Sequence, residues 1–505
     1  MEKEARDGVL KSNEAMFKRL AGTNDRFRFA SYLNAICAIF DPHTEFLPPD
    51  DKENFDITMS GQFEGIGARL QEKDGLLKVS DLIPGSASWR QGILKAGDVI
   101  LKVAQGAAEP VDVTDMMLSD AVKLIRGKKG TEVRLTVRKV DGAVVVIPII
   151  RDKVVIEETY AQSALIEQGE KTIGYIRLPA FYADFAKTSG RSCSDDVRKE
   201  LEKLKADRVD GVVLDLRDNG GGSLQDVVSM AGLFIERGPI VQVKQNGHPA
   251  QVMNDKDPAV VYDGPLAVMV NEHSASASEI MAAAIQDYGR GIIIGSATTF
   301  GKGSVQVFVS LDNAAKPPID TLKPMGSLKL TTQKFFRVNG GSTQLKGVAS
   351  DIVLPDIIRY LDFGEKELEN PMPWDQIPAA RYKPWKKTWD VAELKKKSEE
   401  RVKADEFFRL VEEEAKQLKE ERERSAVSLK LSDYRDRLKK QREETEKLEK
   451  LQTEIAGMEI ANPSADRKAI QSDETKSTRN AEWFKKLRKD HHLAETLKVI
   501  VDMGK

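Results

Sequence analysis

Residues 271–280 read NEHSASASEI, with three serines that alternate with alanines just before a helical pattern. A serine hydroxyl can attack an amide if a base removes its proton and hydrogen-bond donors hold the oxyanion that forms. No Gly-x-Ser-x-Gly frame surrounds Ser274, Ser276 or Ser278. The stretch therefore raises the possibility of a serine nucleophile and the question of which group takes its proton.

A lysine is the natural candidate for that base. The chain has only five histidines, none with metal-ligand spacing, and a metal mechanism is not expected. A lysine can replace histidine as the base, but only in its neutral form. Its pKa must therefore fall from about 10.4 towards 7–8 by burial, a shift that corresponds to about 4 kcal/mol of desolvation. Lys302 follows the apolar run GIIIG and adjoins Phe300, whereas most other lysines lie in charged runs. Lys302 is therefore the predicted base.

Three glycine-rich loops could instead bind a phosphate. GIGARL (65–70) lacks the complete dinucleotide fingerprint, and NGGGS (219–223) follows a predicted strand without the required spacing. GSATTFGKG (295–303) is closest to a P-loop, but it has one residue too many between its glycines and Gly303 where Ser or Thr should bind magnesium. A nucleotide-binding protein stays an alternative, and nucleotide titration would test it.

Helix geometry adds a second indication. Ser276 and Asp287 lie eleven residues apart, about three turns, so a helix places them on one face. A serine at a helix N-terminus also gains the positive end of the helix dipole and nearby backbone N–H groups for an oxyanion. Composition alone favours a tight helix start. The spacing makes the pair Ser276 and Lys302 a comparably strong interpretation.

Four segments must position these residues. Residues 1–57 show helical periodicity, 58–153 form a small β-rich domain, 154–358 alternate strands with helices, and 359–505 are rich in Lys, Glu and Arg and typical of charged helices. The apolar runs of the third segment predict a buried, largely parallel sheet within an α/β core: TIGYIRL, GVVLDL, PLAVMV and GIIIG. The β-rich domain contains the runs GLLKVSDLI, AGDVILKVA, TEVRLTVRKV and AVVVIPII and the helical stretch VTDMMLSDAVKLI.

Composition narrows the functional classes. Hydrophobic residues make up 40% and charged residues 31% of the 505 positions, which is typical of a globular protein with a highly charged portion. A net charge of −2 argues against nucleic-acid binding. No apolar run is long enough to span a bilayer, and MEKEARDGVL lacks the features of a signal peptide. Cys37 and Cys193 are expected to be ordinary thiols, although one disulfide stays open.

Several strings together resemble one family. SASASEIMAAAIQDYGR, TTFGKGSVQ and VVLDLRDNGGGS are similar to the C-terminal processing peptidases, and among them to the tail-specific proteases. DPHTEFLPPDDKENFDITMSGQFEGIGARL resembles the family's lead into its PDZ domain, and TTQKFFRVNGGSTQLKGVASDIVLPD the end of its protease core. The resemblance covers nearly the whole chain. It implies a Clp protease/crotonase-like α/β serine protease core with an inserted PDZ domain and flanking helical regions.

The resemblance implies a role for individual residues. It makes Ser276 the nucleophile, Lys302 the general base and Gln306 the side chain that orients the lysine. Asp287 matches an aspartate that is important in the family, more as a structural residue than as a proton relay. The family's oxyanion donors correspond to the backbone amides of Gly222 and Ala277, although the glycine assignment can slip by one position.

The β-rich domain then corresponds to the PDZ domain. Its carboxylate-binding loop would be Gly65, Ile66, Gly67 and Ala68, whose backbone N–H groups capture a chain terminus while the peptide adds a strand to the sheet edge. Without the resemblance, a structural turn is the simpler interpretation of this loop. The stretch VTDMMLSDAVKLI is expected to line the groove and to favour apolar C-terminal side chains.

The sequence thus predicts a serine endopeptidase that binds proteins by an apolar C-terminal tail and needs neither metal nor cofactor. The resemblance implies a periplasmic location, at most peripheral membrane association and an adaptor lipoprotein as a possible partner, so an incomplete N-terminus is expected. The alternative from another class is a non-catalytic scaffold that binds tails.

Overall fold

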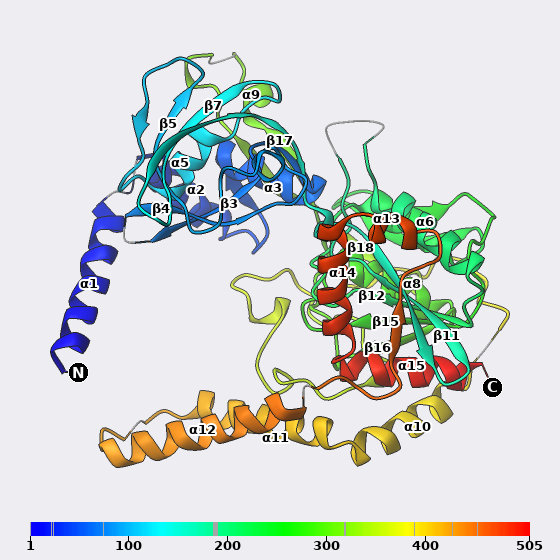
Figure 1. The fold of residues 1–505 in the computed structure, drawn as a ribbon. Coiled ribbons are helices and arrows are strands. Elements are labelled where there is room, and N and C mark those ends of the chain that lie inside the picture. The colour runs from blue at the N-terminus through cyan, green and yellow to red at the C-terminus, as the bar shows by residue number, and fades with distance from the viewer. Residues whose placement is uncertain are drawn as a thin grey trace. The chain divides into compact units, whose positions relative to one another are not determined.

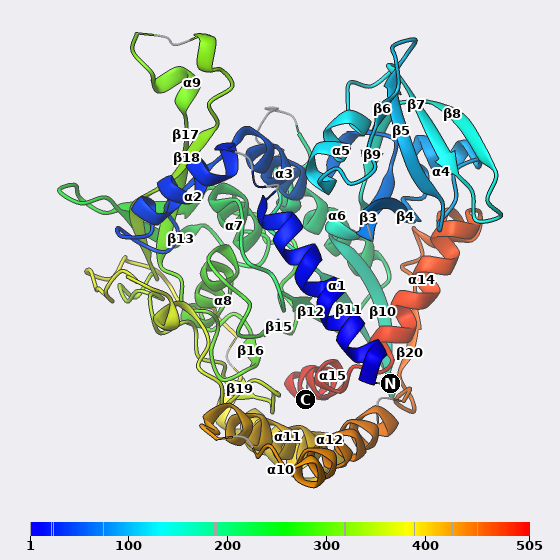
Figure 2. The ribbon, with the colours of Figure 1, turned by 90° about the vertical axis from the view of Figure 1, so that its left-hand side faces the viewer.

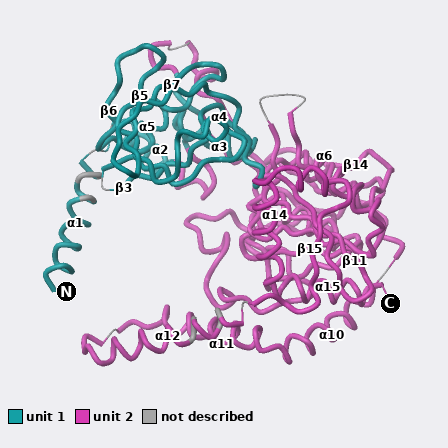
Figure 3. Tube along the Cα trace, viewed as in Figure 1, with its two compact units in different colours: residues 1–36, 46–158, 324–326 teal, residues 37–45, 159–323, 327–505 magenta. Residues whose placement is uncertain are grey.

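A computed structural model of the chain describes residues 2–504, except residues 22, 24, 74, 185–189, 318, 319, 388, 427 and 452. It divides into two compact units (Figure 3). Unit 1 comprises residues 1–36, 46–158 and 324–326, and unit 2 comprises residues 37–45, 159–323 and 327–505. Neither Cys37 nor Cys193 forms a disulfide, which agrees with the expectation of ordinary thiols.

Unit 1 is built around an antiparallel sheet. The strands follow the order β3 (Ala68–Lys73), β4 (Leu76–Leu82), β5 (Val99–Gln105), β7 (Glu132–Arg138) and β8 (Val144–Ile150), and β6 (Val111–Asp112) pairs with β5. All four predicted strands are confirmed, and alternate side chains of β7 (Val133, Leu135, Val137) are fully buried in the core. The helices α4 (Ala87–Gln91) and α5 (Leu118–Ile125) complete the domain.

The helix α5 is shorter than predicted. The expected stretch began at Val113, but the helix starts at Leu118. Asp115 adopts a positive φ of 60°, and the amide of Thr114 bonds to the Asp112 side chain, so a turn precedes the helix. Three more helices and a strand pair belong to the preceding and flanking segments: α1 (Glu2–Ala21), α2 (Asp25–Cys37), α3 (Pro49–Ser60), and β2 (Gln62–Gly65) with β9 (Asp152–Val155).

Unit 2 contains a seven-stranded sheet, whose strand labels can be followed in Figure 2. Its order is β19 (Ile352–Val353), β16 (Ile292–Gly295), β15 (Leu266–Val270), β12 (Gly211–Asp215), β11 (Lys171–Arg177), β10 (Gln162–Gln168) and β20 (Glu459–Ala461). The pairs from β11 to β19 are parallel, which confirms the predicted parallel sheet, while β10 and β20 pair antiparallel. Since parallel strands end at one edge, the loops after β12, β15 and β16 lie near each other.

The two faces of this sheet are covered by different helices. One face carries α6 (Cys193–Ala206), and Gly174 leaves the space that Leu204 of α6 fills, since a Cβ there would lie 2.7 Å from the leucine Cδ1. The other face shares one hydrophobic core with α15 (His491–Met503), which is red in Figure 1. The C-terminal helix therefore belongs to the core of the unit.

A second sheet and further helices complete unit 2. The strands β17 (Ser304–Ser310), β18 (Ser327–Phe336), β13 (Gly238–Lys244) and β14 (Gln251–Asp255) pair antiparallel in that order. The charged tail contains helices as predicted, and also the unpredicted strand β20, which extends the large sheet. The remaining helices are α7 (Leu224–Ala231), α8 (Ala277–Asp287), α9 (Leu311–Ala314), α10 (Val391–Ala404), α11 (Glu406–Glu423), α12 (Leu431–Leu451), α13 (Arg467–Gln471) and α14 (Glu474–Leu487).

Candidate active site

The three serines of SASAS have different environments. The Ser274 hydroxyl donates to the carbonyl of Leu216 at 2.8 Å, and the Ser278 hydroxyl donates to the carbonyl of Asn219 at 2.8 Å. Both side chains are fully buried. Ser276 is only half-buried, and its hydroxyl donates to no described residue; the capping box at the start of α8 uses this hydroxyl only as an acceptor. Of these three serines, only the middle one therefore has a hydroxyl proton that is not committed to a carbonyl.

The backbone holds Ser276 in a conformation that serine rarely adopts. Ser276 caps the N-terminus of α8 with φ 55° and ψ −112°. Such a positive φ is unfavourable for a residue with a Cβ and persists only where the surroundings enforce it. Here the Ser276 amide donates to Oε2 of Glu279 at 2.8 Å, and the neighbouring Ala275 amide donates to the carbonyl of Asn219 at 3.0 Å. The strain is of the kind found at functional sites.

Lys302 lies between β16 and β17. Its Nζ donates to Oε1 of Gln306 at 2.6 Å. Burial, reinforced by the positive charge of Lys329, lowers the pKa of Lys302 to about 8, although nearby carboxylates act in the opposite direction. The lysine therefore has an appreciable neutral fraction near pH 8, as a base requires.

The carboxylate of Glu279 joins the two predicted catalytic residues. Its Oε2 accepts the amide of Ser276 at 2.8 Å and the amide of Lys302 at 2.9 Å, and its Oε1 accepts the Gly301 amide and the Thr299 hydroxyl, both at 2.7 Å. The two backbone segments thus lie within two hydrogen-bond lengths of each other. Among the described residues, no hydrogen bond links the Ser276 hydroxyl to the lysine amine.

Glu279 was not among the residues singled out from the sequence. Its side chain is fully buried, and burial raises its pKa to about 8 against the four hydrogen bonds that lower it. All four partners are donors, so their hydrogen bonds stabilise the ionised carboxylate and partly offset the effect of burial. The spacing Ser-x-x-Glu at the start of a helix is a capping-box signal, so the sequence did carry an indication of this residue.

The glycine loop lies directly against Ser276. A Cβ on Gly221 would meet the Ser276 Cβ at 2.7 Å and the Ala277 nitrogen at 3.1 Å, so only glycine fits. The amide of Gly221 is committed to Oδ1 of Asn219 at 2.9 Å. In contrast, the amides of Gly222 and Ala277 donate to no described residue. These two predicted donors are therefore available to a bound oxygen.

Asp287 lies at the opposite end of α8 from Ser276, about 16 Å away at 1.5 Å per residue. Its carboxylate pairs with the Arg337 guanidinium, at 2.6 Å between Oδ1 and NH2, and accepts from Asn339 at 2.9 Å. The structure therefore does not bring Asp287 to the lysine, and its contacts fix the far end of the helix.

The predicted carboxylate loop of unit 1 connects β2 to β3. The amides of Ile66 and Gly67 donate to no residue in the described part of the chain. Gly67 has φ 78°, and a Cβ there would lie 2.1 Å from that of Ser86, so glycine is required. The loop thus offers free N–H groups at the start of β3, beside which α5 packs.

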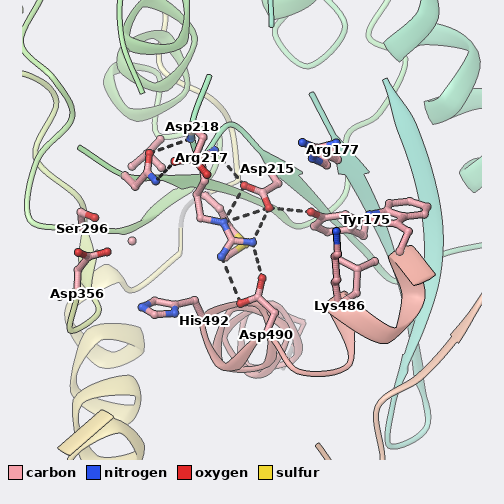
Figure 4. A pocket seen from close by; sticks show the side chains of 16 residues that line it. Tyr175, Arg177, Asp215, Arg217, Asp218, Ser296, Asp356, Lys486, Asp490 and His492 are labelled. Atoms are coloured by element: carbon pink, nitrogen blue, oxygen red, sulfur yellow. Dashed lines mark hydrogen bonds and ion pairs between the residues drawn. The ribbon is translucent and has the colours of Figure 1, made fainter. Parts of the chain in front are cut away.

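A cavity of about 420 Å³ opens at the carboxyl ends of β11, β12, β15 and β16 (Figure 4). In its wall, Arg217 binds Asp215 and Asp490, each with 2.6 Å between NH2 and Oδ2, and the Tyr175 hydroxyl donates to Asp215 at 2.7 Å. Asp490 also caps α15 through the amide of Leu493. This network was not predicted, and it connects α15 to the loop that leads to the glycines.

Two features are absent from the described residues. Within them, no group of three or more His, Cys, Asp or Glu side chains is arranged to hold a metal ion. No helix there combines the length and apolar character that crossing a membrane requires.

Comparisons with known proteins agree with this architecture. Peptidase family S41 matches residues 172–354, a PDZ domain matches 56–138, and the C-terminal domain of tail specific protease matches 358–505. Over 380 residues the chain is 42% identical to a tail-specific protease of Haemophilus influenzae, covering 75% of this chain and 53% of the relative. It is 34% identical over 332 residues to the carboxy-terminal processing protease CtpA of Bacillus subtilis, covering 65% and 64%.

A third relative is matched over more of its length. The chain is 30% identical over 354 residues to a carboxy-terminal-processing protease of Bartonella bacilliformis, covering 68% of this chain and 75% of the relative. The domains define the class of S41 peptidases that carry a PDZ domain. Within that class, the chain belongs to the family of tail-specific and carboxy-terminal processing proteases, which confirms the resemblance seen in the sequence. It spans about half to two thirds of the length of the first two relatives.

Proposed function

We propose that this chain is a serine endopeptidase that uses Ser276 and Lys302 as a catalytic pair and selects proteins by an apolar C-terminal tail. One observation supports the pair above all. Of three neighbouring serines, only Ser276 has a hydroxyl that donates to no described residue, and its amide shares a carboxylate oxygen with the amide of Lys302. Family membership supports the reaction class.

In the proposed reaction, neutral Lys302 takes the hydroxyl proton as Ser276 Oγ bonds to the substrate carbonyl carbon. The carbonyl oxygen becomes an oxyanion, which the amides of Gly222 and Ala277 stabilise. When the C–N bond breaks, the lysine ammonium returns its proton to the leaving amine. Lys302 then deprotonates a water that hydrolyses the acyl-enzyme, and Ser276 recovers its proton.

Tail recognition is proposed for the loop of Gly65, Ile66, Gly67 and Ala68. Its free amides suit a terminal carboxylate, and β3 offers an edge for an added strand. The matching PDZ domain supports this assignment. The domain boundaries at 57/58, 153/154 and 358/359, the periplasmic location and an adaptor lipoprotein stay predictions.

Two substrates that differ only in an apolar or an acidic C-terminal residue test the tail preference. We expect a kcat/KM roughly 10-fold or more higher for the apolar tail, since an acidic side chain loses its hydration in an apolar groove. The variant Ser276→Ala should bind the apolar tail as well as the parent protein while cleaving neither substrate. Equal cleavage of both substrates would contradict tail selection, and cleavage by the variant would contradict the nucleophile. Binding without cleavage by the parent protein would favour the scaffold.

The lysine predicts a pH dependence. Because Lys302 must be neutral and its pKa is lowered to about 8, kcat/KM should rise with pH through a midpoint near that value. Burial raises the pKa of Glu279 to a similar value. The rise of kcat/KM with pH therefore reflects the titration of both coupled groups. A pH series on a short, uncharged substrate measures it, and a profile that stays flat between about pH 7 and 9 would contradict a lysine base.

A further inference from the structure

The orientation of the Gln306 amide decides whether Lys302 can act as a base. The Lys302 Nζ donates to Oε1 of Gln306 at 2.6 Å. A neutral amine has one lone pair, which must stay free to accept the serine proton. If the amide were reversed, its Nε2 would donate to that lone pair and block it. The oxygen and nitrogen of an amide have nearly the same shape, so hydrogen bonds must set the orientation.

Two hydroxyl groups contact the other end of this amide. The Gln306 Nε2 donates to Ser304 Oγ at 2.9 Å and to Thr331 Oγ1 at 3.0 Å. Thr331 on β18 is the direct cross-strand partner of Gln306 on β17, so the two side chains share a face of the sheet. A hydroxyl can donate or accept, and these contacts alone therefore permit either orientation of the amide.

Asp41 removes this ambiguity. The Thr331 hydroxyl donates to Oδ1 of Asp41 at 2.8 Å. A carboxylate can only accept, so the single hydroxyl proton of Thr331 points to Asp41. Thr331 Oγ1 must then accept a hydrogen bond from Gln306, which turns the amide oxygen towards Lys302.

The surroundings keep Asp41 ionised and fixed. Its side chain is buried and accepts the Thr44 hydroxyl at 2.5 Å and the backbone amides of His43 and Thr44 at 2.9 and 3.0 Å. Burial acts to raise the pKa of Asp41, but the hydrogen bonds together lower it. The Thr44 hydroxyl also accepts the amide of Thr331 at 3.1 Å, which holds this segment beside β18.

We propose that Asp41 is a positioning residue that, through the Thr331 hydroxyl, fixes the Gln306 amide with its oxygen towards Lys302 and so leaves the lysine lone pair free for the serine proton. The inference rests on the proposed function. It extends the site to a segment 261 residues before the base. The charged groups that act on Lys302 are Lys329, Glu365, Glu279 and Asp41 itself. Thr331→Val leaves all four unchanged, whereas Asp41→Asn also removes a charge that raises the pKa of Lys302.

The variants Thr331→Val and Ser304→Ala form a matched pair, since each removes one acceptor of the Gln306 Nε2. Of these two hydroxyls, only that of Thr331 is held in one direction by a carboxylate, Asp41. Only Thr331→Val should therefore allow the Gln306 amide to reverse. We expect Thr331→Val to lower kcat roughly 10-fold with little change in KM and to displace the midpoint of the pH profile, because a donor then faces the amine. Ser304→Ala should keep a nearly unchanged kcat and midpoint, and Thr331→Ser should restore both parent values.

A second variant tests the carboxylate itself. Asp41→Asn can donate to Thr331, which would then donate to Gln306 and reverse the amide, so we expect a larger loss of kcat than for Thr331→Val. Thermal unfolding shows which variants remain folded. If Asp41→Asn does not fold, Thr331→Val alone tests the inference. An unchanged kcat and pH midpoint in Thr331→Val, or an effect on KM alone, would overturn the inference. Cleavage by Ser276→Ala would overturn the proposed function instead, so the two failures are distinguishable.

Discussion

Replacing Lys302 with arginine is expected to lower kcat/KM by roughly 10³-fold or more, as the loss of a catalytic base does in known serine proteases. Arginine keeps the positive charge but does not deprotonate in proteins. It cannot take the Ser276 proton, although it can still donate to Gln306. Steady-state cleavage of a tailed substrate measures the loss, and Lys302→Ala should be equally inactive.

The same substitution at Lys329 is the matched control. Lys329 lies close enough for its charge to lower the pKa of Lys302, and its Nζ pairs with Oε1 of Glu45 at 2.7 Å. Lys329→Arg keeps both the charge and the partner, so the activity should remain close to that of the parent protein. If Lys302→Arg were as active as Lys329→Arg, the lysine would not be the base. The double variant Ser276→Ala with Lys302→Arg should lose no more than either single variant, because the two residues act as a unit.

Replacing Glu279 is expected to affect both activity and stability. Glu279→Ala leaves three amides and the Thr299 hydroxyl without an acceptor in a buried site, at roughly 1–3 kcal/mol each. Glu279→Gln keeps the shape of the side chain, but its amide nitrogen is itself a donor. It would face two of the N–H or O–H groups that donate to a carboxylate oxygen in the parent protein. We expect kcat to fall roughly 100-fold in Glu279→Gln, comparable to the loss of one oxyanion donor, because Ser276 and Lys302 are no longer held by one oxygen. Cleavage rates and thermal unfolding measure the two effects.

Glu272 provides the control for this substitution. Its carboxylate is half-buried and accepts the Ser296 hydroxyl, a donor that an amide oxygen can also satisfy. Glu272→Gln should therefore remain nearly as active as the parent protein. Equal activity of the two glutamine variants would contradict the joining role of Glu279.

The pKa of Glu279 also predicts a change in the pH dependence of stability. Its pKa in the folded protein, about 8, is higher than the ordinary value of 4.5. Between these values the folded state binds more protons than the unfolded state, so the contribution of Glu279 to stability falls as the pH rises. Glu279→Gln should reduce the change in the free energy of unfolding between these two pH values. Thermal unfolding measured at a series of pH values in this range tests the prediction.

The sequence predicted the parallel sheet, the PDZ strands and the candidate pair, because each depends on local pattern or on a family motif. It did not predict contacts between distant segments. Asp41 meets Thr331 across 290 residues, and nothing in either local stretch indicates the other. Arg217 and Asp490 are likewise 273 residues apart and lie in polar surroundings that favour a solvated surface. The strand β20 is only three residues long within a charged tail, too short for a period-two pattern.

The shared core of the sheet and α15 has a consequence for synthesis on the ribosome. Leu493, Leu497 and Val499 are fully buried, and Asp490 holds the arginine beside the glycine loop. While the nascent chain is still growing, Ser276 and Lys302 are already made, but the sheet face that supports them is exposed. The candidate active site is therefore completed only when residues near position 500 emerge from the ribosome, so a chain still being translated does not yet carry the complete site.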